Sequence, residues 1–167
     1  MSAALTLRNR QQIRPVDTRH LRRICRALLE DLLPTQTAEL GIRLVAAPEM
    51  TRINGRFLQH AGATDVITFD YAELPNRKPQ SPVPGVQLHG ELFVCLDEAV
   101  LQARRYGTTW QAELVRYIIH GTLHLLGHDD HRIPDRRRMK RAEDRLLRAL
   151  AARFPLSHLE RKRKLRA

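Results

Sequence analysis

The chain of 167 residues has a mass of 19.3 kDa, which is typical of a single domain. Its 43% apolar and 28% charged residues exclude a disordered, collagenous or disulfide-stapled chain, and no uncharged apolar run approaches the roughly 20 residues of a membrane span. The excess of 29 Lys and Arg over 18 Asp and Glu gives a net charge of +11, which indicates a polyanionic partner, most often nucleic acid.

Hydrophobic periodicity predicts the elements of the first half of the chain. Residues 5–11 alternate apolar and polar side chains like an edge strand. Asp17 is placed to cap a helix over residues 18–33, whose apolar positions share one face. Strands are expected over 41–47 and 64–71, with a short helix over 48–60 between them.

The second half begins with a proline-rich stretch over residues 72–87, which we expect to be a surface loop and the main place for disorder. After it, the pattern predicts a strand over 89–97 and a helix over 98–105 that stops near Gly107. The next predicted helix is capped by Thr108 or Thr109 and runs to about Leu126. A last helix is expected from Pro134 to about Ala152. This order of elements predicts one unit of α+β or α/β type with about four strands.

The positive charge is concentrated at the C-terminal end. Residues 1–35 hold seven basic and three acidic residues, residues 36–131 hold eight and eleven, and residues 132–167 hold fourteen and four. A basic segment attached to a nearly neutral body is typical of an electrostatic arm. We expect a domain over residues 1–155 and a flexible basic tail over 156–167.

Two features bear on the cellular compartment. Cys25 and Cys95 are isolated thiols, which we expect to be buried and free in a reducing environment. The N-terminal residues lack the apolar segment of a secretory signal. We therefore expect a cytoplasmic protein.

Four of the eight histidines fall within residues 120–131. His120 and His124 are four residues apart on a predicted helix, so they project from one face and can share a metal ion. Gly127 allows the chain to turn sharply at the end of this helix. The pattern is typical of half of a zinc site.

The third metal ligand has several candidates. The spacing of the metzincin pattern places it at Asp130, which we favour over His131, and His128 is weaker still. Three protein ligands would leave one position open for water, as in a catalytic zinc site. A closed structural site is less favoured because such sites usually use cysteines, and no cysteine lies nearby in the sequence.

Gly121 occupies the position after the first histidine, where zinc peptidases carry the Glu that activates water. The missing base argues against peptide hydrolysis. A metal here would still polarise a phosphoryl oxygen, and the basic tail favours a phosphodiester substrate.

A basic stripe is expected on the last helix, because its arginines recur with helical spacing. We expect it, with the tail over 161–166, to hold RNA backbone without reading bases, although an ordinary solvated helix face would show the same pattern. The stripe consists of Arg138, Arg141, Arg145 and Arg148.

The segment from His120 to Asp130 resembles the signature of the YbeY family of bacterial rRNA maturation endoribonucleases. Two further segments agree with that family: residues 54–57 followed by 64–69, with ten residues from Asn54 to Thr64, and residues 90–92. The resemblance runs from about residue 40 to residue 150.

The resemblance implies a single α+β domain with a small mixed sheet of about four strands flanked by about five helices. It implies a zinc-dependent endoribonuclease specific for single-stranded RNA, which acts in 16S rRNA 3′-end maturation and ribosome quality control. The implied partners are rRNA, the small ribosomal subunit and assembly factors, with no membrane. One Zn²⁺ would be held by His120, His124 and Asp130, as in an Asp variant of the family, with no catalytic group assigned beyond a water on the metal. Imidazole ligands suit nickel as well as zinc.

The chain departs from the family at Leu58, where most members have an Arg thought to aid phosphate handling. Arg56 or His60, each two residues away, can supply this cation, and Arg56 is a candidate RNA contact. Two alternatives therefore stay open: a non-catalytic ribosome assembly factor with a structural metal, and a metal-dependent hydrolase of another substrate.

Overall fold

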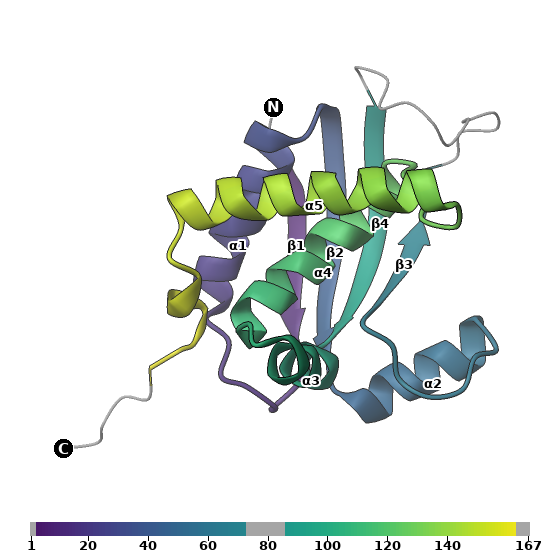
Figure 1. Ribbon diagram of the computed structural model, residues 1–167, viewed down its shortest axis with the longest axis vertical. Coiled ribbons are helices and arrows are strands. Elements are labelled where there is room, and N and C mark those ends of the chain that lie inside the picture. Colours follow the sequence, from purple (N-terminus) through teal and green to yellow (C-terminus); the bar gives the residue numbers. More distant parts are fainter. Residues whose placement is uncertain (1–2, 73–85, 163–167) are drawn as a thin grey trace.

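The computed structural model describes residues 3–72 and 86–162, and within these ranges it contains five α-helices and one sheet of four strands (Figure 1). In chain order the elements are β1 (Ala4–Asn9), α1 (Thr18–Ala27), η1 (Leu28–Leu32), β2 (Thr35–Val45), α2 (Ala47–Phe57), β3 (Val66–Asp70), β4 (Val86–Cys95), α3 (Leu96–Tyr106), α4 (Trp110–Leu125), α5 (Ile133–Arg153) and η2 (Leu156–Leu159). The expected single α+β domain is confirmed.

The strand order is β1-β2-β4-β3. β1, β2 and β4 are parallel, and β3 runs antiparallel to β4 with Ile67 opposite Phe93. The mixed sheet is therefore confirmed, and so is the edge position predicted for β1. β3 forms the other edge.

Alternation along β2 separates the two faces of the sheet. Leu40, Ile42 and Leu44 are fully buried on one face, while Glu39 and Arg43 lie on the other. α1 and α4 cover the first face, and α5 lies across α4 (Figure 1). Among the described residues, the opposite face is covered mainly near α2, where Val45, Met50, Ile67 and Cys95 form a second small core.

The predicted helix boundaries follow local capping chemistry. The Asp17 carboxylate accepts a hydrogen bond from the backbone N–H of His20 at 3.0 Å, and the Thr109 hydroxyl accepts one from Ala112 at 3.1 Å. Gly107 ends α3 with a φ of 66°, a left-handed conformation that favours glycine. The predicted caps are thereby confirmed, with Thr109 as the residue that caps α4.

The largest differences from the predicted elements lie in β2 and at the end of the first helix. β2 begins at Thr35 rather than at residue 41, because Gln36, Thr37 and Glu39 face solvent and hide the strand pattern. The last turn of the first predicted helix is a π-helix, in which the Leu33 N–H donates to the Leu28 carbonyl at 3.1 Å.

Residues after α5 pack against the domain. Leu159 is fully buried, and its carbonyl accepts a hydrogen bond from the Asp17 N–H at 2.7 Å. The Arg161 N–H donates to the Pro15 carbonyl at 2.6 Å. Ordered packing therefore extends past residue 155, where the flexible tail was expected to begin, and residues 163–167 lie outside the described part.

The cysteines, the absence of an expected membrane span and the proline-rich loop can each be compared with the structure. Cys25 and Cys95 are buried free thiols, as predicted. Among the described residues, no helix is long and apolar enough to cross a membrane. Most of the expected loop, residues 73–85, lies outside the described residues, and its last two positions belong to β4.

Candidate metal centre

α4 carries both histidines of the predicted site on a helix that is buried along most of its length. Gly121 faces the sheet, where an added Cβ would lie 2.8 Å from Leu92 Cδ2 and 3.2 Å from Val66 Cγ2. A side chain as large as Glu therefore has no room after His120 unless the Leu92 and Val66 side chains move. Close packing of α4 on β3 and β4 explains why the base of zinc peptidases is missing here.

The two imidazoles converge through their Nε2 atoms. His120 Nε2 lies 3.0 Å from His124 Nε2. The His120 Nδ1–H is hydrogen-bonded to the Glu143 carboxylate, and the His124 Nδ1–H donates to the His128 carbonyl at 3.0 Å. Because both Nδ1 atoms are engaged, each Nε2 is left to bind a cation.

Asp130 lies where it could supply a third donor. The chain reverses at Gly127, which has a φ of 96°. This turn brings Asp130 Oδ2 to 3.7 Å from His120 Nε2 and 3.6 Å from His124 Nε2. Two imidazole nitrogens and one carboxylate oxygen are donors that zinc accepts, so the three residues fit the expected ion.

The alternative ligand His131 is not part of this group. Its side chain is 89% exposed, and its Nε2 lies 3.7 Å from Asp129 Oδ1. Asp129, Asp130 and His131 form a second, more exposed cluster that could hold a cation. The structure therefore places Asp130 with the two histidines of α4, and it does not place His131 there.

Glu143 of α5 was not identified from the sequence. It is only 6% exposed and lies between Met139 and Leu146 on the buried face of its helix. A buried carboxylate needs partners, and here they are His120 and Arg116, whose guanidinium lies 3.9 Å from the Glu143 carboxylate. The sequence carried one signal for this residue, because Glu143 is an acidic residue at a position that the helical pattern assigns to the apolar face.

Negative charge surrounds His120. Burial lowers its pKa, but the hydrogen bond and charge of Glu143, together with the carboxylates of Asp65 and Asp130, raise the pKa above its usual value. Asp65 directly precedes β3, and its carboxylate accepts a hydrogen bond from the Val66 N–H at 2.8 Å. These carboxylates favour a cation at His120, although Asp65 had no predicted role.

The predicted RNA-contacting arginines lie outside the three-residue group. Arg56 is exposed at the C-terminal end of α2, next to the exposed Leu58, and His60 is also exposed. The stripe is exposed on α5, the helix whose buried face supplies Glu143. The structure thus confirms exposure of Arg138, Arg141, Arg145 and Arg148.

The comparison with known families agrees with this arrangement. A family model described as Endoribonuclease YbeY matches residues 6–151. The chain belongs to the YbeY family. The match includes all three residues that could hold a metal, and it confirms the resemblance seen in the sequence.

Several YbeY relatives align over most of the chain. Endoribonuclease YbeY of Nocardioides sp. is 34% identical over 140 residues, which are 83% of this chain and 93% of the relative. That of Salinibacter ruber is 31% identical over 146 residues, which are 87% of this chain and 91% of the relative. Other matches are partial. Endoribonuclease YbeY of Myxococcus xanthus is 39% identical over 109 residues, which are 65% of this chain and only 35% of the relative. That of Chlorobium luteolum is 42% identical over 99 residues, which are 59% of this chain and 64% of the relative.

A solved structure shows the same fold. The solution structure of TM1509 from Thermotoga maritima superposes with a TM-score of 0.61. The aligned region covers 98% of this chain and 99% of that protein, at 19% sequence identity. The YbeY-family chain and TM1509 therefore share their architecture.

Proposed function

We propose that this protein is a zinc-dependent endoribonuclease that cleaves single-stranded RNA. The convergence of His120, His124 and Asp130 carries the proposal. Relatives named Endoribonuclease YbeY support RNA as the substrate. We place the activity in the cytoplasm, in 16S rRNA 3′-end maturation and ribosome quality control, with the small ribosomal subunit and assembly factors as partners.

The exposure of the donors favours a catalytic metal over a structural one. The side chains of His120, His124 and Asp130 are 26%, 28% and 35% exposed, so the group faces solvent. Three protein donors leave a coordination position open, whereas structural zinc sites are closed by four. When bound, zinc supplies Lewis-acid polarisation of a phosphoryl oxygen.

The chain's own residues then orient the donors and hold the substrate. Glu143 and the His128 carbonyl fix the two imidazole rings. Asp130 adds negative charge that partly balances the cation. The exposed arginines of α5 and Arg56 bind phosphates of the RNA backbone, which positions the strand without reading its sequence.

Metal removal tests the proposed activity. Protein stripped with a chelator should not cleave a single-stranded RNA, and cleavage should return when zinc is restored. A double-stranded RNA of the same sequence should remain intact throughout. The measurement is single-turnover cleavage on a denaturing gel, and cleavage by metal-free protein would contradict the metal mechanism.

The stripe on α5 makes a second prediction, tested with matched double variants. Arg141→Gln with Arg145→Gln should reduce the salt dependence of RNA binding, because each lost phosphate contact lowers the slope of log K against log salt by about 0.7. Arg104→Gln with Arg105→Gln, on the exposed end of α3, removes the same charge elsewhere. Equal slopes for the two double variants would show that the stripe makes no specific contact with RNA phosphates.

Leu58 favours one alternative function. It is 43% exposed where most family members have Arg, so a cation is missing at this position. This departure would suit a ribosome assembly factor that binds RNA without cutting it. RNA binding by zinc-loaded protein without cleavage would support that alternative.

A further inference from the structure

Three phenylalanine rings form a row from the uncovered face of the sheet to α2. Successive ring centroids of Phe93, Phe69 and Phe57 lie 5.7 and 5.5 Å apart, with interplanar angles of 79° and 82°. The Arg43 guanidinium lies 5.5 Å from the Phe93 centroid, and the Arg56 guanidinium lies 5.4 Å from the Phe57 centroid. Three of the four phenylalanines of the chain thus stand in one row with a cation at each end.

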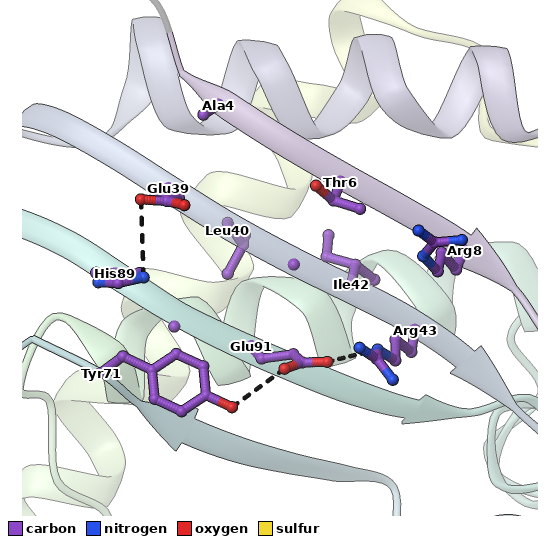
Figure 2. A pocket seen from close by; sticks show the side chains of 12 residues that line it. Ala4, Thr6, Arg8, Glu39, Leu40, Ile42, Arg43, Tyr71, His89 and Glu91 are labelled. Carbon is purple, nitrogen blue, oxygen red and sulfur yellow. Dashed lines mark hydrogen bonds and ion pairs between the residues drawn. The ribbon is translucent and has the colours of Figure 1, made fainter.

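At the Phe93 end of the row, the cation is already paired with other side chains of the protein. Arg43 forms an ion pair with Glu91 at 2.5 Å, and the Tyr71 hydroxyl donates to the same carboxylate at 3.1 Å (Figure 2). Glu39 and Glu91 both line the hollow of about 250 Å³ beside Arg43. These two carboxylates balance the charges of Arg8 and Arg43 in the same hollow, so this end has no surplus positive charge for a phosphate.

The Phe57 end faces solvent, with Arg56 over part of the ring. Phe57 is 56% exposed at the C-terminal end of α2, and Arg56 beside it is exposed and has no ion pair with a described residue. Arg52, one helical turn earlier, is also exposed. Phe69 packs edge-on against Phe57, so the exposed ring is held by a neighbour that is itself half-buried over the second core.

We infer that Phe57, with Arg56 and Arg52, is a stacking subsite for a base of single-stranded RNA. An exposed ring flanked by cations is the chemistry that binds single strands, because every base has a π-face and every nucleotide a phosphate. The identity of the strand as RNA rests on the proposed function. The subsite binds without sequence preference.

β3 connects this subsite to the metal centre. Phe69 extends from β3 toward Phe57, while Val66 at the start of the strand contacts the face of α4 at Gly121. Asp65, just before β3, acts electrostatically on His120. β3 is an edge strand, with Val66 in the core under α4 and Phe69 in the small core beside α2, so we expect a bound single strand to cross this edge between the subsite and the three-residue group.

Fluorescence anisotropy of a labelled ten-nucleotide RNA tests the inference, with the full chain and with EDTA present so that cleavage does not interfere. Phe57→Ala should weaken binding by about 5-fold or more, the loss typical of one stacked base. Phe57→Tyr should bind like the wild type, while Phe57→Leu should resemble Phe57→Ala. Tyr106→Ala, which removes an exposed aromatic ring from α3, should have no effect. Binding of an abasic strand of equal length should be the same for all four variants.

The outcomes separate this inference from the proposed function. If wild-type protein cleaves RNA but Phe57→Ala binds it normally, the subsite is wrong and the proposed function stands. If binding depends on Phe57 but zinc-loaded protein does not cleave, the subsite stands and the nuclease proposal fails. If wild-type protein binds no RNA, both fail. Equal weakening for the abasic strand would show a change in folding or charge and would overturn the subsite.

Discussion

His124→Ala should abolish zinc binding and RNA cleavage together. The substitution removes one of three donors and leaves His120 and Asp130, which are too few to hold the ion in a defined position. Loss of a group that only orients a ligand typically costs 10- to 100-fold in metal affinity, so loss of the ligand itself should cost more than about 100-fold. Zinc content after dialysis and single-turnover cleavage are the two measurements.

His131→Ala is the matched control for this prediction. His131 lies within the same segment, but its side chain is 89% exposed and groups with Asp129 and Asp130 rather than with the histidines of α4. Zinc content and cleavage should match those of the wild type. If His131→Ala loses zinc while Asp130→Ala retains it, the assignment of the third donor is wrong.

Glu143→Ala should lower zinc affinity by about 10- to 100-fold, the range found when a hydrogen-bonded partner of a metal ligand is lost. The carboxylate is buried and holds the His120 ring through Nδ1. Its removal frees the ring to rotate and removes negative charge from the site. Glu143→Gln keeps an acceptor oxygen for the Nδ1–H and should lose less affinity. Competition with a chromophoric chelator measures all three proteins.

Asp144→Asn tests whether the loss of zinc affinity comes from the hydrogen bond to His120 rather than from any lost carboxylate on α5. Asp144 is adjacent to Glu143 and accepts a hydrogen bond from Arg116 at 2.8 Å, which lowers the pKa of Asp144. It makes no hydrogen bond to His120, so its loss should leave zinc affinity unchanged. Equal zinc affinities for Glu143→Ala and the wild type would show that the Glu143 contact does not position the ligand.

Local chemistry explains how much of the fold could be predicted from the sequence. Caps such as Asp17 and Thr109 act within three residues, and the spacing of His120 and His124 is set by one helical turn. These features depend on neighbours in the sequence. The same holds for the turn at Gly127 that brings Asp130 back toward the helix.

The rest of the site depends on contacts between distant segments. Glu143 lies 23 residues after His120, and only the packing of α5 across α4 brings them together. Asp65 reaches His120 because α4 packs on β3, which requires the glycine at position 121. The position of Glu143 on the apolar face of its helix predicts burial, but it does not identify His120 as the partner. No pattern in the sequence indicates Asp65 or the row that ends at Phe57.

Anomalous diffraction from zinc-loaded crystals tests the central claim most directly. The account predicts a peak at the zinc absorption edge, bound by His120 Nε2, His124 Nε2 and Asp130, with one further position open to solvent. A peak at the exposed cluster of Asp129 and His131, with none between the two histidines of α4, would contradict it.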